Sequence, residues 1–295
     1  MRWTPGGSSS NVEDRRGMGG GGGGFRLGGG GGMGLGGAVI LLVLSLLFGR
    51  NLFTGAGTDS YGPNDPNATT TTAGGEVAPV SSSAEEETLK QFSTFVLNDA
   101  QETWAKILPQ AAGTQYRDAK LVLFRDVVQS GCGNAEAAMG PFYCPRDERV
   151  YLDLGFFGDL QRRFGASGDF AQAYVIAHEL GHHVQKLMGT EARVHQLQES
   201  RPQIANELSV RLELQADCYA GVWGNSVKQQ RILDPGDMEE GLRAAAAVGD
   251  DRIQRQATGS VHPESFTHGS SEQRMTWFRR GFDSGRIDNC DTFAQ

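Results

Sequence analysis

The sequence predicts an α+β protein, mostly helical with a small sheet, preceded by a disordered Gly-rich segment and one transmembrane helix. Three observations support this prediction. The chain has 42 glycines, and a dense cluster of them lies between Gly17 and Gly37. An uncharged apolar run extends from that cluster. Beyond residue 84, apolar residues recur at helical spacing, and two runs show the character of strands. The length of 295 residues allows one sizeable domain with accessory segments.

The N-terminal part of the chain predicts a membrane anchor. Residues 1–32 are rich in Gly, Ser and Arg, which is typical of disorder. Segment 33–53 is apolar and uncharged up to its last residues, and its uncharged run is near the lower limit of roughly 17 residues for a transmembrane helix. Arg15, Arg16 and Arg26 precede it. The positive-inside rule therefore predicts a single-pass cell-membrane protein with a cytoplasmic N-terminus and a periplasmic, or otherwise extracytoplasmic, folded domain. A cleaved signal peptide is the alternative, but the long preceding segment and the lack of an A-x-A site favour an uncleaved signal anchor.

The rest of the chain divides into a linker and one folded domain. Residues 54–83 are rich in Gly, Pro, Thr and Ser and predict a flexible linker. The domain is expected to span 84–295. A helix is predicted from about Ala84 to Leu108, because acids occupy its first turn and apolar residues follow at helical spacing. Two strands and four helical segments are predicted after it, over 119–126, 149–157, 169–188, 202–230, 237–257 and 270–281.

Charge and cysteine content limit the possible partners. The net charge is −8 and no Lys/Arg run is present in the domain, which argues against nucleic acid as a partner. No feature indicates an oligomeric state. None of the four cysteines belongs to a CxxC pair. Cys132 and Cys144 lie in one Gly/Pro-rich loop and are candidates for a short disulfide, which export would permit, and Cys218 and Cys290 are left as a second candidate pair. Four reduced thiols are the alternative.

The segment AHELGHH inside the predicted helix 169–188 has the chemistry of a metal centre. Residues four apart share a helix face, so His178 and His182 can bind one ion, and imidazole is a good zinc ligand. Glu179 is rotated about 100° from His178 and can act as general base on a water molecule. The alternative is a pair of satisfied core histidines, which the apolar surroundings disfavour. His183 points away from the ligand face.

A third protein ligand is needed for a catalytic zinc site, and Glu213 is the predicted one. It has Asp217 four residues later on the same helix face, where a carboxylate can accept a proton from the far nitrogen of a ligand histidine. Glu207 is the alternative ligand, but Arg211 at the same offset suggests a surface ion pair. A solvated acidic face is the alternative for Glu213 and Asp217. No fourth Cys or His has the spacing of a closed structural site, so one zinc ion per chain is expected.

At this point the chain resembles a known family. HELGH followed by ELQADCYAGVW is similar to the zincins with a glutamate third ligand (gluzincins), and more narrowly to the bacterial neutral zinc metallopeptidases, the YpfJ-like family. The resemblance extends to the Arg/Gly-rich N-terminus with its apolar run, to GCG…FYCP…VYLDL and to SFTHGSSEQRMTWF. It implies a zincin-like fold, zinc on His178, His182 and Glu213, Glu179 as the base, Asp217 in support of a ligand, and a protein or peptide substrate.

The C-terminal region offers a further candidate. VHPESFTHGSSEQRMTWFRRG contains His262, His268 and Arg274. His268 stands at a loop-to-helix junction and is the predicted donor to the transition state; the alternative is that His262 and His268 cap the helix or hold the loop. The predicted protein is a membrane-anchored zinc metalloendopeptidase. A catalytically silent zinc-binding scaffold, or a zinc hydrolase acting on cell-wall peptides or another amide, are the alternatives.

Overall fold

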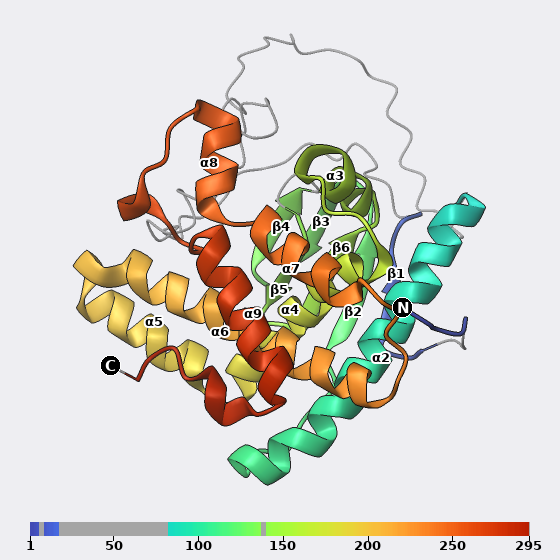
Figure 1. Cartoon of the computed structure of the whole chain (residues 1–295), viewed down its shortest axis with the longest axis horizontal. Helices are drawn as coiled ribbons and strands as arrows, with labels where there is room; N and C mark the ends of the chain where they lie inside the picture. The colour runs from blue at the N-terminus through green and yellow to red at the C-terminus, as the bar shows by residue number, and fades with distance from the viewer. Residues whose placement is uncertain (6–8, 18–81, 137–139, 295) are drawn as a thin grey trace, which may run out of the picture.

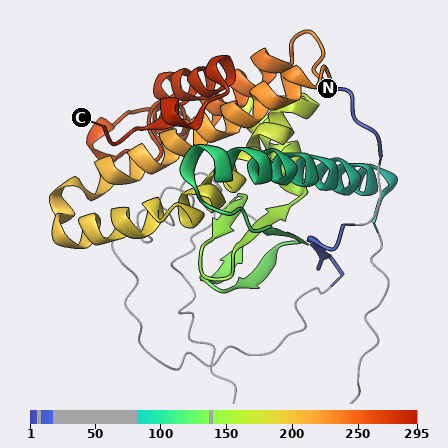
Figure 2. The ribbon, with the colours of Figure 1, turned by 90° about the horizontal axis from the view of Figure 1, so that it is seen from below.

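The computed structural model describes residues 1–5, 9–17, 82–136 and 140–294, and this part of the chain is mostly helical with a small sheet (Figure 1). Figure 2 shows the strands on one side of the molecule and the C-terminal helices on the other. The long helix α2 (Ala84–Ala112) contacts both parts. Ser83 caps its first turn through a reciprocal pair of hydrogen bonds with Glu86, which explains why the helix begins where the sequence predicts.

Four strands form the sheet in the order β1-β2-β6-β5. The two predicted strands, β2 (Lys120–Phe124) and β6 (Arg149–Asp153), are parallel neighbours at its centre. Strand β1 (Val12–Asp14) pairs in parallel with β2, and β5 (Phe142–Cys144) pairs antiparallel with β6. A separate hairpin is formed by β3 (Val127–Ser130) and β4 (Gly133–Glu136).

The predicted strand 149–157 is too long at its end. Strand β6 stops at Asp153, whose carboxylate accepts a hydrogen bond of 2.8 Å from the backbone N–H of Gly155. This contact turns the chain into helix α3 (Gly155–Phe164), which the apolar Gly-Phe-Phe sequence had suggested to be strand. Short apolar runs do not distinguish the two states, so the turn at Asp153 decides the outcome.

The remaining helices surround the metal-ligand candidates. They are α4 (Asp169–Leu187), α5 (Thr190–Ser200), α6 (Ala205–Gln229), α7 (Asp237–Ala247), α8 (Asp250–Thr258) and α9 (Ser271–Ser284). Helix α5 was not predicted. The predicted helix 237–257 is instead two helices, α7 and α8, because the backbone N–H of Asp250 donates to the carbonyl oxygen of Gly269 at 2.9 Å and not to a preceding helical turn. Glycine at position 249 permits the close approach of the Ser271 backbone.

The predicted disorder over residues 1–32 is wrong for the part of that segment that the structure describes. Strand β1 lies at the edge of the sheet, with Val12 opposite Leu121. Arg16 is buried, and its guanidinium pairs with Asp14 at 2.6 Å and with Glu87 of α2 at 2.7 Å. Pairing with a distant strand and a distant helix therefore orders a segment whose composition alone suggests a flexible chain.

The predicted transmembrane topology is also wrong. Among the described residues, no helix combines the length and the apolar composition needed to cross a bilayer. A single crossing within 33–53 would in addition place β1 and β2 on opposite sides of a membrane, yet these strands are hydrogen-bonded to each other. The fold class is corrected accordingly to a mostly helical protein with a small sheet, and the cytoplasmic N-terminus with an extracytoplasmic domain is withdrawn. Segment 33–53 itself, and 54–81 of the predicted linker, lie outside the described residues.

Both candidate disulfides are confirmed. Cys132 is bonded to Cys144, which closes the loop between the hairpin and strand β5. Cys218 of α6 is bonded to Cys290, in a 3-10 turn (Ile287–Cys290) after α9. The second bond ties the C-terminal end of the chain to the helix that carries Glu213. No described cysteine is left as a free thiol.

Candidate metal centre

The close crossing of α4 and α6 positions the candidate ligands. A methyl group at Gly181 would lie 2.9 Å from the carbonyl oxygen of Ala216 and 3.0 Å from its Cα, closer than real side chains allow. Glycine at this position therefore lets the two helix backbones approach. His178 and His182 flank Gly181 on α4, and Glu213 lies almost one turn before Ala216 on α6. The crossing brings the three side chains together.

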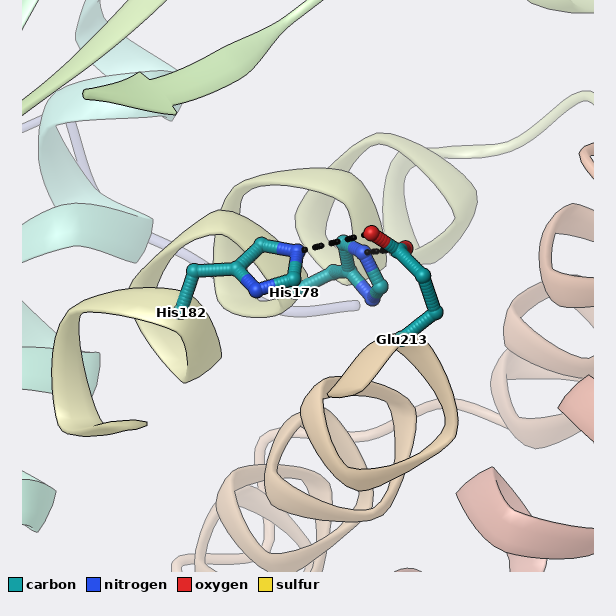
Figure 3. A group of neighbouring side chains, drawn as sticks. All are labelled: His178, His182 and Glu213. Atoms are coloured by element: carbon teal, nitrogen blue, oxygen red, sulfur yellow. Dashed lines mark hydrogen bonds and ion pairs between the residues drawn. The ribbon is translucent and has the colours of Figure 1, made fainter. Parts of the chain in front are cut away.

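Figure 3 shows the imidazoles of His178 and His182 on α4 next to the carboxylate of Glu213 on α6. Nε2 of His178 lies 3.1 Å from Oε2 of Glu213, and Nε2 of His182 lies 3.5 Å from Oε1. One ligand atom from each residue lies within 4.8 Å of the others, a spacing that can hold a metal ion. The side chains of His182 and Glu213 are 21% and 18% exposed, so solvent reaches this group of atoms.

The hydrogen bonds of Nδ1 determine that His178 and His182 each present Nε2 to Glu213. Nδ1–H of His178 donates to Oδ1 of Asp217 at 2.9 Å, and Nδ1–H of His182 donates to Oε1 of Gln185 at 2.9 Å. These tautomers are assigned from the partners, whose oxygens only accept. Each Nε2 then presents a lone pair toward Glu213. Two lone pairs facing a carboxylate require a cation or added protons between them.

Asp217 is fully buried and connects three elements. It accepts hydrogen bonds from His178, from the hydroxyl of Tyr174 on α4, and from the guanidinium of Arg274 on α9. Burial by itself would raise the pKa of Asp217, but Arg274 and His178 hold this pKa below its usual value. The carboxylate therefore stays charged and orients the imidazole of His178, as such partners do in metal centres.

In the metal-free protein, the neighbouring charges move the pKa values of the ligands in opposite directions. Burial would lower the pKa of His178, but Asp217 and Glu213 raise it to about 9. Burial would raise the pKa of Glu213, but His182 and His178 hold it well below its usual value. The surroundings of His178, His182 and Glu213 thus favour positive charge between these side chains. In the metal-free protein, bound protons supply that charge.

Glu179 lies on α4 between the two histidines in sequence and is buried. Burial raises the pKa of its carboxyl, and positive charge on His178 and His182 opposes that increase. The backbone N–H of Tyr143 on edge strand β5 donates to this carboxylate. A held carboxylate of raised pKa beside metal ligands has the properties of a general base.

His268 lies in the loop before α9 and is held by Asp250, the first residue of α8. Oδ1 of Asp250 is 3.2 Å from Nδ1 of His268, and Oδ2 accepts from the backbone N–H groups of Thr267, His268 and Gly269. The adjacent Gly269 packs against Leu214, the neighbour of Glu213 on α6. Burial would lower the pKa of His268, but Asp250 and Glu213 raise it.

The other candidates from the C-terminal region lie in different surroundings. His262 is 61% exposed and pairs with Glu264 at 3.4 Å. Arg274 is engaged with the buried Asp217 and is no free donor for substrate. Ser270 caps α9 together with Gln273. His262 therefore has no contact with the metal-ligand group among the described interactions.

Sequence reasoning did not identify the supporting roles of two residues: Gln185, which is hydrogen-bonded to His182, and Tyr174, which is hydrogen-bonded to Asp217. Tyr174 lies four residues before His178, and Gln185 three residues after His182, so helical spacing contains a signal for both. His183, the second histidine of the pair, is buried; its Nε2 lies 2.6 Å from the carbonyl oxygen of Arg117 and its Nδ1 2.9 Å from the Tyr143 hydroxyl.

The alternative third ligand, Glu207, lies away from the histidines. It is 57% exposed and pairs with Arg211 at 2.7 Å, which matches the surface ion pair that its spacing suggests. The chemistry of the remaining donor set, two imidazole nitrogens and one carboxylate with access to solvent, is that of catalytic zinc sites. An all-oxygen set would instead favour magnesium or calcium. The residues present therefore fit zinc.

Comparisons with known proteins agree with this chemistry. A family model described as "Putative neutral zinc metallopeptidase" matches residues 1–293. The chain is 47% identical over 311 residues to the uncharacterized protein YpfJ of Escherichia coli K12, which covers 100% of this chain and 99% of that relative. It is 46% identical over 208 residues to the uncharacterized protein Rv2575 of Mycobacterium tuberculosis H37Rv, which covers 67% of this chain and 68% of that relative. No solved structure matches the chain.

Proposed function

Because the chain belongs to the family described as "Putative neutral zinc metallopeptidase", we propose that it is a zinc metalloendopeptidase of the HExxH…E type. Its substrates would be proteins or peptides. One observation carries the proposal: Nε2 of His178, Nε2 of His182 and the carboxylate of Glu213 converge, with the buried Glu179 between the two histidines in sequence. A protein that only binds zinc has no need for this second, non-ligating carboxylate.

The three converging side chains would hold one zinc ion. When bound, zinc supplies a Lewis acid that lowers the pKa of a water molecule and polarises the substrate carbonyl. Glu179 takes the proton from the attacking water and passes it to the leaving amine, because its raised pKa suits both transfers. Asp217 and Gln185 keep the two imidazoles in the tautomers that ligation requires.

His268 is the proposed donor to the oxygen that gains negative charge during the attack. Its Nδ1 is engaged by Asp250, which leaves Nε2 available, and the loop that carries it packs beside Glu213 through Gly269 and Leu214. An imidazole of raised pKa is protonated over a wider pH range and so remains a donor.

The decisive experiment compares Glu179→Gln with the unsubstituted protein. We expect Glu179→Gln to retain about one zinc ion per chain, because Glu179 is not a ligand, and to lose hydrolysis of a denatured protein substrate by at least about 100-fold. Zinc is measured by metal analysis after dialysis. The matched control is Glu207→Gln, an exposed carboxylate on α6, which should retain both zinc and hydrolysis.

Two results would contradict the proposal. If the unsubstituted, zinc-loaded protein hydrolyses no member of a broad panel of unfolded proteins, peptides and cell-wall peptides, a zinc-binding scaffold replaces the peptidase. If Glu213→Ala retains zinc while Glu207→Ala loses it, the third ligand is misassigned.

A further inference from the structure

A second cluster of carboxylates lies at the N-terminal ends of α4 and α7. Its members are Asp169, Asp237 and Glu240, with one carboxylate oxygen of each within 4.8 Å of the others. The cluster contains a cation that belongs to the chain. The α-ammonium nitrogen of Met1 lies 2.7 Å from both carboxylate oxygens of Asp169 and 3.2 Å from Oδ2 of Asp237.

Met1 is buried, whereas the carboxylates around its ammonium group differ in exposure. Met1 as a whole is 8% exposed, and the side chains of Asp237 and Asp169 are 6% and 33% exposed. Asp234 stands farther away, at 3.8 Å, and is 47% exposed. Burial would lower the pKa of the ammonium group, but Asp169 and Asp237 raise it. The group is therefore held charged by two close carboxylates.

The residues after Met1 are held by independent contacts. The backbone N–H of Arg2 donates to the carbonyl oxygen of Ile232 at 2.7 Å. Trp3 packs edge-on against Phe92 of α2, with ring centroids 5.3 Å apart. In Figure 1 the N-terminus lies beside the segment that leads into α7. These contacts direct the ammonium group into the carboxylate cluster.

The carboxylates of the cluster make further hydrogen bonds that do not prevent the contacts of Asp169 and Asp237 with the ammonium group of Met1. Oδ2 of Asp237 also accepts from the backbone N–H of Asp234 at 2.7 Å, and Oε2 of Glu240 accepts from that of Phe170 at 3.2 Å. Asp169 is the first residue of α4, and the start of this helix has no side-chain cap hydrogen bond. Both carboxylate oxygens of Asp169 accept from the ammonium group of Met1. The N-cap residue of α4 is Gly168.

We propose that the Asp169–Asp237–Glu240 cluster is a binding site for an α-ammonium group, occupied by that of Met1, and that it fastens the N-terminal segment to α4. The recognised chemistry is a primary ammonium that donates to two carboxylates at once. An acyl group or an additional residue on this nitrogen replaces the ammonium by an uncharged amide with a single N–H, so the site rejects both. The contact ties the N-terminus to the first turn of the helix that carries His178 and His182.

The reactivity of the α-amine of the full-length chain tests the proposal. The protein is treated near pH 7 with an N-hydroxysuccinimide ester, and labelling of Met1 is followed by mass spectrometry of the N-terminal peptide. We expect labelling in the folded protein to be at least about tenfold slower than in the same chain unfolded in urea, because reaction requires local opening. Asp169→Asn/Asp237→Asn should remove most of this protection, whereas Glu239→Gln, an exposed carboxylate in the same turn of α7, should leave it unchanged.

Equal labelling rates in the folded and urea-unfolded protein would overturn the proposal, and so would full protection in the folded Asp169→Asn/Asp237→Asn variant. If the double variant does not fold, single Asp169→Asn is used, since that side chain is partly exposed. As a second measurement, one glycine added before Met1 should lower the melting temperature, and one glycine added after Gln295 should not. An unchanged melting temperature with the N-terminal glycine also contradicts the proposal.

Discussion

Arg274 and Asp217 form a buried ion pair directly behind a candidate metal ligand. Nε of Arg274 lies 2.8 Å from Oδ2 of Asp217, and Nη2 lies 3.0 Å from Oδ1, the same oxygen that accepts from Nδ1 of His178. The imidazole on α4 is therefore linked through α6 to α9. The orientation of His178 thus depends on a residue 96 positions away in the chain.

Replacing Asp217 with Asn should weaken zinc binding. The amide can still accept the proton of His178, but it loses the negative charge that makes the imidazole a better ligand. We expect affinity to fall roughly 10- to 100-fold, as measured by competition with a chromophoric chelator. Glu207→Gln on the same helix is the control. An affinity within twofold of the unsubstituted protein would show that Asp217 does not support the ligand.

Replacing Arg274 with Met should destabilise the metal-free protein. Methionine keeps much of the side-chain volume but leaves the carboxylate of Asp217 buried without its cation. The free energy of unfolding in urea should fall by about 3–5 kcal/mol. Arg279→Met, an exposed position on α9, should change it little. Combining Arg274→Met with Asp217→Asn should cost less than the sum of the two changes, because both act on one pair; strict additivity would contradict the ion pair.

Zinc binding should release protons in neutral solution. The pKa of His178 in the metal-free protein is raised from 6.5 to about 9, so its protonation stabilises the metal-free fold fully below pH 6.5, and this contribution disappears as pH rises through about 9. Zinc has to displace that proton, so zinc affinity should increase with pH over the same window. Titration calorimetry in buffers of different ionisation enthalpy should show at least about one proton released per zinc near pH 7.5. A pH-independent affinity would exclude protonated ligands.

Replacing Gly181 with Ala should separate the two helices. The added methyl group would meet the backbone of Ala216, which cannot move without shifting α6. We expect a loss of about 1–3 kcal/mol in unfolding free energy together with weaker zinc binding. Gly158→Ala on α3 is the matched control, because its methyl group would meet only the exposed end of the Arg162 side chain and no backbone. Normal stability and zinc affinity in Gly181→Ala would rule out the close crossing.

The elements that the sequence predicts correctly are those with local signals. The start of α2 follows from Ser83 and Glu86, and the start of α9 from Ser270 and Gln273, because capping involves residues three apart. Strand β1 carries no such signal. Its order comes from pairing with Leu121–Leu123, more than 100 residues away, so the composition of residues 1–32 pointed to disorder.

The candidate site divides in the same way. The geometry of an α-helix places His178 and His182 on one face, because they are four residues apart. The same geometry places Glu179 next to that face. The prediction of Glu213 rather than Glu207 as third ligand rests on adjacent residues, yet the positions of the two carboxylates depend on where α6 crosses α4 at Gly181.

No local sequence pattern predicts the structural roles of Arg274, Asp250 and the α-ammonium group of Met1. Each acquires its role from a partner on another element: Asp217, His268 and Asp169, respectively. Helical spacing is a property of neighbouring residues and can be read from the chain. The pairing of buried charges depends instead on how folded elements pack, because a charge is stable in the interior only where packing delivers an opposite one.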